Sequence, residues 1–358
     1  MGETGPIAEI ANKVAKEVFK WFRWERVPLR DQNFKCLKQK KHAPTKKKEH
    51  THPVDVVFKY DDPYLNRVVL FNTDLKSYKK DSITAPNIRP ALKSLAQTID
   101  CARVSPEWRD QYDESGSGDI RGLLFVYNHD AEYDSNFARY LVPPKPRDKQ
   151  ASTDNEKSLN VDSLPLEAGQ MIHIVEPRTI AYMTTIVADA YRMHAEGTFP
   201  AKNYYFYYPE LKLHRTHGHR NRRPATIEMI CGPFLIVEHE AVVKHDEETN
   251  KTETSFPPGV VIFYNRAGNT HYEFLYLFDL LSSYQMLDGD SVLRIRVLHH
   301  APHPHIRSNF HKAIQDYVHD WGFDDYKKDR LESIDLALVE IQKTSFSQKD
   351  IGWDRSSQ

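Results

Sequence analysis

The sequence is poor in the features that define several large classes of protein. It has three cysteines in 358 residues, Cys36, Cys101 and Cys231, too few and too far apart for a disulfide framework or a CxxC metal site. We interpret them as buried thiols. No apolar run approaches the roughly 20 residues of a membrane-spanning helix, and the N-terminus MGETGPIAEI lacks a basic segment followed by an apolar stretch. We therefore expect a cytoplasmic protein with no membrane partner.

The sequence also lacks an excess of either charge and lacks the common nucleotide-binding and hydrolase motifs. The 49 Lys and Arg residues nearly balance the 50 Asp and Glu residues, so contact with nucleic acid must come from local clusters. Neither a GxxxxGK[ST] phosphate loop nor a GxSxG elbow is present, so we expect no ATP-driven motor in this chain. The length and the 40% hydrophobic content suit a globular protein of two domains.

The first 141 residues show a regular succession of helix and strand patterns. Apolar residues recur every three or four positions in 5–23 and again in 87–102, which predicts two helices with one buried stripe each. Short apolar runs predict four strands: QNFKCLK, VDVVFKY, RVVLFNTDL and GLLFVYN. The order is helix, three strands, helix, strand. We predict an α/β fold with a mixed sheet flanked by helices, because the last strand reaches its neighbours only through a helical crossover.

The rest of the chain divides into a polar segment and a second α/β pattern. Residues 142–165 are rich in Pro, Ser, Asp and Lys, which predicts a linker or a long surface loop. Residues 166–358 then alternate strand and helix patterns, and we assign them to a C-terminal domain for recognition, oligomerisation or regulation. The run GVVIFYN echoes the earlier GLLFVYN. This echo suits a duplicated unit whose second copy lacks the charged site, and equally suits two buried strands of similar composition.

Charged residues stand at the ends of two of the predicted strands. Side chains alternate along a strand, so Asp74 and Lys76 project from one face while Leu75 projects from the other. Asp55, in the preceding strand, lies beside Asp74 if the two strands are neighbours in register. Two adjacent carboxylates are costly without a cation, and oxygen ligands of this kind suit Mg²⁺ or Mn²⁺. An ammonium beside such an ion fits hydrolysis of a phosphodiester.

With Asp55, eighteen intervening residues and then Asp74-Leu75-Lys76 in this order of elements, the sequence resembles the PD-(D/E)xK nuclease superfamily, which has the restriction-endonuclease-like fold. The strand beginning His-Pro-Val-Asp is most similar to Mrr-like and related bacterial defence nucleases. The resemblance implies a Mg²⁺-dependent (or Mn²⁺-dependent) endonuclease. It implies metal ligation by Asp55, Asp74 and the Leu75 carbonyl, with Lys76 as the catalytic lysine. The alternative is that both aspartates are polar strand ends and that Lys76 is solvated or salt-bridged.

Members of this superfamily often add residues from the flanking helices. At about 100° per residue, Glu17 lies at the edge of the buried stripe of the first helix and Glu9 points away from it. We favour Glu17 as the helix acid and hold Glu9 in reserve. In some relatives the second helix contributes a glutamine, for which Gln97 is the position, although Cys101 stands where a tyrosine often follows.

Two basic segments are candidate phosphate contacts. A lysine-rich connection, KQKKHAPTKKKEH, precedes the Asp55 strand, and KLHRTHGHRNRRP lies in the C-terminal part. The residues we single out in them are Lys46, Lys47, Lys48, Arg215, Arg220, Arg222 and Arg223. Histidines gather at 214–219 and at 299–305, but no cysteine stands nearby, so we do not expect structural zinc there.

Together these patterns predict an enzyme that hydrolyses DNA with the help of a metal ion. One site per chain implies a dimer or larger assembly, or a partner subunit, for cutting both strands. The resemblance implies an effector of bacterial anti-phage defence. The alternatives are a catalytically silent, nuclease-like subunit that binds nucleic acid or scaffolds a complex, and an RNA-cutting toxin.

Overall fold

The computed structural model of the protein describes residues 15–43, 45, 49–141, 158–208, 222–246, 251–289, 291–322 and 325–342. The described residues divide into two compact units, one that ends at Ile180 and one that runs from Ala181 to Gln342. Among the described residues, no helix combines the length and the apolar character that crossing a membrane requires.

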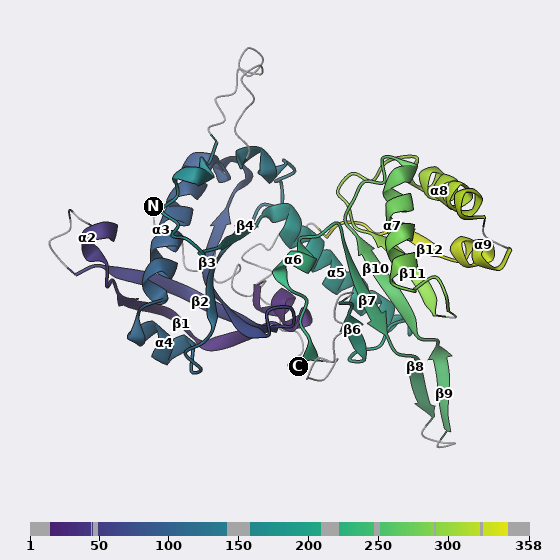
Figure 1. Ribbon diagram of the computed structural model, residues 1–358, viewed down its shortest axis with the longest axis horizontal. Coiled ribbons are helices and arrows are strands. Elements are labelled where there is room, and N and C mark those ends of the chain that lie inside the picture. The colour runs from purple at the N-terminus through teal and green to yellow at the C-terminus, as the bar shows by residue number, and fades with distance from the viewer. Residues whose placement is uncertain are drawn as a thin grey trace, which may run out of the picture. The chain divides into compact units, whose positions relative to one another are not determined.

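The first unit is built on a five-stranded mixed sheet in which the strand order follows the chain (Figure 1). The strands are β1 (Glu25–Lys35), β2 (Thr51–Asp62), β3 (Arg67–Tyr78), β4 (Asp119–Asn128) and β5 (Ile172–Val175). The helices are one that covers residues 15–21 of the described chain, α2 (Gln39–His42), α3 (Ala85–Ala102) and α4 (Pro106–Tyr112). The pairs β1–β2 and β2–β3 are antiparallel, whereas β3–β4 and β4–β5 are parallel.

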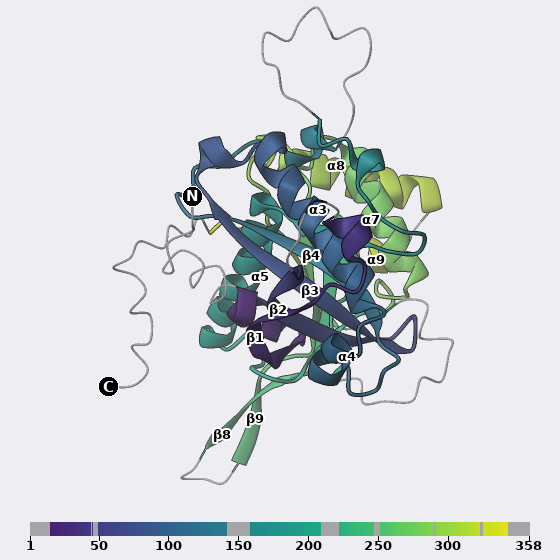
Figure 2. The same ribbon diagram turned by 90° about the vertical axis from the view of Figure 1, so that its left-hand side faces the viewer.

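Each face of this sheet buries apolar side chains under a different helix. Figure 2 shows α3 in front of the strands, where Leu95 and neighbouring residues of the helix pack with Leu124 and Val126 of β4. On the other face, Phe71 of β3 stacks on Trp24, which in turn stacks on Phe19 of the first helix. The two helices therefore lie on opposite faces of the sheet, because side chains alternate along β3 and β4.

The predicted succession of helix, three strands, helix and strand in a mixed sheet is confirmed. Two details differ from the sequence patterns. β1 begins at Glu25, earlier than the run QNFKCLK suggested, and β5 joins the first sheet although the sequence assigned residues 166–180 to the C-terminal part. A four-residue strand carries too little periodicity to reveal which sheet it joins, and its pairing with β4 decides the matter.

The second unit is the predicted C-terminal α/β part, and its main sheet is also five-stranded, with order β12-β11-β10-β7-β6. Its strands are β6 (Tyr204–Phe206), β7 (Phe234–His239), β8 (Val242–Asp246), β9 (Lys251–Phe256), β10 (Gly259–Tyr264), β11 (Val292–Val297) and β12 (Asp335–Leu338). Its helices are α5 (Pro177–Ala195), α6 (Ile227–Ile230), α7 (His271–Ser283), α8 (Ile306–Trp321) and α9 (Asp325–Glu332). The antiparallel hairpin β8–β9 projects from the end of the sheet (Figure 1).

The second unit repeats the topology of the first. β6–β7 and β7–β10 are antiparallel and β10–β11 and β11–β12 are parallel, with α5 before the first strand and α7 between β10 and β11. By strand order β10 corresponds to β3, not to β4, so the echoing runs GLLFVYN and GVVIFYN occupy different positions in the two sheets. β10 reads GVVIFY and is buried throughout, so it carries no counterpart of Asp74 or Lys76.

Candidate active site

The two strands that carry the predicted acidic residues are neighbours. β2 and β3 pair antiparallel with Val56 opposite Thr73, and the same register one residue further places Asp55 opposite Asp74. The carboxyl groups of Asp55 and Asp74 lie within hydrogen-bonding reach of each other. The pairing that the site requires is therefore present, and it follows from a hairpin whose turn lies at residues 63–66.

Lys76 joins the two aspartates from the same strand. Its Nζ lies 2.7 Å from Oδ1 of Asp74, with 27% of the lysine side chain and 18% of the aspartate side chain exposed. Thr73, Leu75 and Ser77 are buried while Asp74 and Lys76 are half-buried, as alternation along β3 predicts. The group is thus partly open to solvent, which an ion and a substrate require.

The environment of Asp55 opposes its ionisation when no cation is near. Burial and the neighbouring charge of Asp74 raise the pKa of Asp55 to about 7. Two weaker effects lower this pKa: the Leu75 N–H donates a hydrogen bond to Asp55 Oδ2 at 2.8 Å, and the positive charge of Lys76 is near. A divalent cation between the carboxylates would remove this cost. The donor set of carboxylate oxygens is the kind that Mg²⁺ and Mn²⁺ prefer, so the residues present fit such an ion.

The accessory residues expected from the helices are placed elsewhere. Glu17 is exposed on the first helix, which packs on the face of the sheet opposite to the one from which Asp74 projects. Glu9 lies outside the described residues. Gln97 of α3 directs its amide to the carbonyl oxygen of His42, at 3.5 Å, on the side of the helix that carries Cys101 one turn later. The helix period indicated which residues share a stripe, but not which strand face each helix would cover.

The predicted nucleic-acid contacts fall largely outside the described residues. This is so for Lys46, Lys47, Lys48, Arg215 and Arg220. Arg222 is exposed and Arg223 is half-buried. In the same lysine-rich segment, Lys38 and Lys41 pair with the buried Asp100 at 2.7 and 3.0 Å, so these two lysines also stabilise the fold.

The interpretation of the three cysteines as buried thiols is confirmed for Cys36 and Cys101 and is wrong for Cys231. Cys231 is exposed, whereas Cys36 and Cys101 are buried with their sulfur atoms 3.8 Å apart. His42 and His52 complete a group of four potential metal ligands. Three of the four stand within seventeen residues of sequence, a signal that was available, but Cys101 is brought to them only by the packing of α3.

A mixed sheet in the order helix, three strands, helix, strand, with two apposed aspartates and a lysine on its central hairpin, defines a PD-(D/E)XK nuclease domain. Nucleases of this class typically use divalent metal ions. Residues 1–179 match the family model described as "GAPS4 protein PD-(D/E)XK nuclease domain". The match covers half of the chain, so the protein belongs to this family. The narrower resemblance to Mrr-like nucleases stays a prediction. Searches of curated proteins and of solved structures found no match.

Proposed function

We propose that the protein is a metal-dependent endonuclease that hydrolyses phosphodiester bonds of DNA with the first unit as its catalytic part. The observation that carries the proposal is the apposition of Asp55 and Asp74 on paired strands, with Lys76 against Asp74 at 2.7 Å. The family match supports a nuclease, and the raised pKa of Asp55 supports a cation at this point.

In the proposed mechanism the residues of this chain bind the ion and handle charge. Asp55, Asp74 and the carbonyl group of Leu75 would hold Mg²⁺ or Mn²⁺. When bound, such an ion polarises the phosphate and makes a water molecule a stronger nucleophile at neutral pH. Lys76 presents an ammonium on the same face of β3, where it offsets the negative charge that grows on the phosphate and holds a proton at Nζ. The Leu75 N–H fixes the orientation of the Asp55 carboxylate.

The test is cleavage by the purified full chain, with linear DNA, circular DNA and RNA offered side by side in Mg²⁺, Mn²⁺ or EDTA. We expect metal-dependent cutting of DNA that falls by at least about 100-fold in Asp74→Asn and in Lys76→Ala. Asp61→Asn, an exposed aspartate of the same hairpin, is the matched control and should cut normally. Cutting of RNA alone would replace the DNA assignment by that of an RNA-cutting toxin. Equal activity in the variants and the wild type would refute the site.

We further propose that the enzyme acts in the cytoplasm as an effector of bacterial anti-phage defence. Membership of the GAPS4 family and the resemblance to defence nucleases support this role. One site per chain suggests a homo-oligomer or a partner subunit for cutting both strands, and a nuclease toxic to its host needs a partner or trigger that restrains it. Expression of wild type and Asp74→Asn in cells with and without phage, followed by survival counts and genome integrity, tests the role.

A second candidate function concerns the C-terminal unit, because its topology is nuclease-like while β10 has no acidic pair. This unit would then be a catalytically silent module that binds nucleic acid or a partner. Salt-dependent DNA binding that survives Asp55→Asn and needs no metal would favour this role for the chain as a whole.

A further inference from the structure

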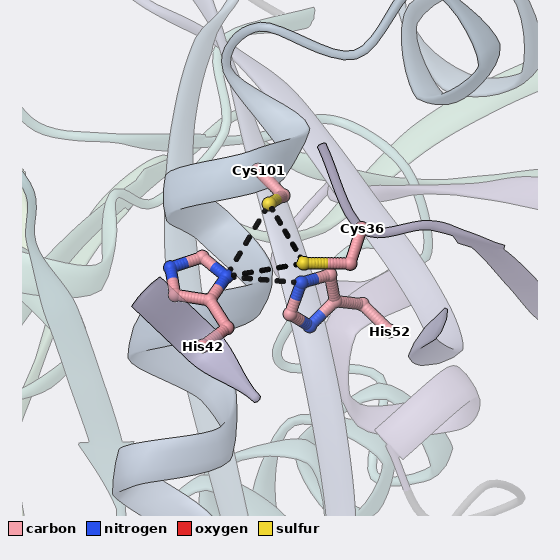
Figure 3. A group of neighbouring side chains, drawn as sticks. All are labelled: Cys36, His42, His52 and Cys101. Atoms are coloured by element: carbon pink, nitrogen blue, oxygen red, sulfur yellow. Dashed lines mark hydrogen bonds between the residues drawn. The ribbon is translucent and has the colours of Figure 1, made fainter. Parts of the chain in front are cut away.

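Four potential metal ligands from four separate parts of the first unit converge in its interior (Figure 3). Cys36 directly follows β1, His42 ends α2, His52 lies at the start of β2, and Cys101 lies in the last turn of α3. All four side chains are buried: the side chain of His42 is 2% exposed, and the other three residues are at most 5% exposed. We propose that Cys36, His42, His52 and Cys101 bind a structural zinc ion, separate from the acidic site.

Four of the six distances between the ligand atoms match the edges of a zinc tetrahedron. With bonds of about 2.3 Å to sulfur and about 2.0–2.1 Å to nitrogen, the edges are about 3.8 Å for S–S, 3.6 Å for S–N and 3.3 Å for N–N. The Cys36 and Cys101 sulfurs are 3.8 Å apart, and His42 Nδ1 lies 3.5 and 3.4 Å from them. His42 Nδ1 lies 3.3 Å from His52 Nε2, and the two remaining edges are within 4.8 Å.

Hydrogen bonds alone do not account for this arrangement. His42 Nε2 lies 3.0 Å from the Asp100 carboxylate, to which it can only donate. In the neutral ring Nδ1 then has one lone pair and no hydrogen, yet it faces two sulfur atoms and a ring nitrogen at contact distance. One lone pair directed at a cation in the centre of the group explains all three approaches together.

The surroundings of the group are those of a metal site. A histidine ligand usually donates its second N–H to a carboxylate, and Asp100 provides that carboxylate for His42. Asp100 is itself held by Lys38 at 2.7 Å, by Lys41 at 3.0 Å and by the Gln170 amide at 3.1 Å.

The ligand types select zinc over the ion expected at Asp55 and Asp74. Two sulfur and two imidazole ligands in a closed tetrahedron are typical of structural Zn²⁺, whereas Mg²⁺ takes oxygen ligands. A disulfide is the other product two such cysteines could form, but their sulfur separation of 3.8 Å is far beyond the S–S bond length of about 2.05 Å.

A zinc ion here would fasten the connection between β1 and β2 to the end of α3. That connection contains the lysines proposed to contact phosphate. His52 also precedes Asp55 by three residues, about 10 Å along β2, so the ion would help to fix the start of the strand that carries the proposed active site. The inference does not depend on nuclease activity, since the four ligands are outside the acidic group.

The test uses the full chain, purified without a histidine tag from zinc-supplemented cells and dialysed, with metal content measured by mass spectrometry. We expect about one zinc per chain and at least a tenfold loss in Cys101→Ser and in His52→Gln. Cys231→Ser, which removes the exposed cysteine, and Asp74→Asn, which alters the acidic site, should both keep the zinc. Asp100→Asn should keep it but lower the affinity about 10- to 100-fold in chelator competition.

Replacement of the zinc by Co²⁺ in the wild-type chain gives a readout that does not require a folded variant. We expect the intense visible absorption of tetrahedral Co²⁺ together with thiolate-to-cobalt charge transfer, both abolished by excess Zn²⁺. Zinc at background level in the supplemented wild type would overturn the proposal. So would a weak octahedral cobalt spectrum, or a Cys36–Cys101 disulfide in peptide mapping.

Discussion

Neutralising Asp55 should stabilise the metal-free protein while it abolishes cleavage. In the Asp55→Asn variant the side-chain oxygen can still accept the Leu75 N–H, so the hairpin keeps its hydrogen bond. What the variant removes is a buried carboxylate that repels Asp74. A residue that costs stability in the absence of its ion is expected of a binding site and not of a structural strand end.

The magnitude follows from the pKa of Asp55, which rises from an ordinary value of 3.8 to about 7 in the folded chain. Between these pH values the folded state binds a proton that the unfolded state releases, so stability rises as the pH falls from 7 towards 4, and the full penalty applies above pH 7. A pKa difference of one between the folded and unfolded states corresponds to about 1.4 kcal/mol. The largest loss of unfolding free energy that Asp55 can cause is therefore about 4 kcal/mol. Solvent reaches the partly exposed Asp74 and screens the pair, so we expect a gain of about 2 kcal/mol at pH 8.

The assay is urea unfolding in EDTA at pH 8 and at pH 5, followed by the fluorescence of the buried Trp24 and Trp108. Asp55→Asn should exceed the wild type at pH 8 and exceed it by clearly less at pH 5, where the folded carboxyl is protonated and only ionisation of the unfolded chain still costs stability. Added Mg²⁺ should stabilise only the wild type. Asp61→Asn is the control for a change of charge on β2. A loss of stability in Asp55→Asn at pH 8, or an equal gain at both pH values, would refute the reasoning.

Four further outcomes follow from the described contacts. Lys76→Ala should lose cleavage at least about 100-fold in gel assays while Lys59→Ala, on the same sheet, cleaves normally. Asp189→Ala should destabilise the second unit by about 3–5 kcal/mol in urea unfolding, because Asp189 accepts two 2.8 Å hydrogen bonds from the buried Arg296. Burial lowers the pKa of His239 from 6.5 to about 4, so the unfolded state binds the extra proton between these values. The free energy of unfolding of the second unit should then fall by about 1 kcal/mol for each pH step of one between pH 6.5 and pH 4. His239→Gln should reduce this slope. EDTA should stop cleavage reversibly and lower the melting temperature only by the stabilisation that Mg²⁺ supplies, whereas a strong thiol-competing zinc chelator should lower that temperature further.

Much of the first unit could be predicted from sequence because its signals are local. The alternation of Asp74, Leu75 and Lys76 along one strand decides which side chains share a face, and a short turn decides that β2 and β3 pair antiparallel. Their charges stand out against apolar neighbours. Hence the fold class could be predicted from the sequence, and the apposition of Asp55 with Asp74 could be predicted on the condition that their strands pair in register.

Positions that depend on how distant elements pack could not be predicted in the same way. The helix period placed Glu17 at the edge of a stripe, but the stacking of Phe19, Trp24 and Phe71 decides that this helix covers the face opposite to Asp74. The repeated topology of the second unit was similarly hidden. The similar runs GLLFVYN and GVVIFYN suggested that β10 corresponds to β4, whereas the strand order makes β10 the counterpart of β3.

By itself the sequence determined the two long helices, the first four strands and the charged hairpin of this nuclease domain, because periodicity and turns act over a few residues. Only the tertiary structure decided that Cys36, His42 and His52 meet Cys101, since α3 returns along the sheet about fifty residues later in the chain and buries its last turn against the β1–β2 connection. Distances in sequence carry no information about such a crossing. A metal site assembled from separate elements becomes visible only when the core that unites them is packed.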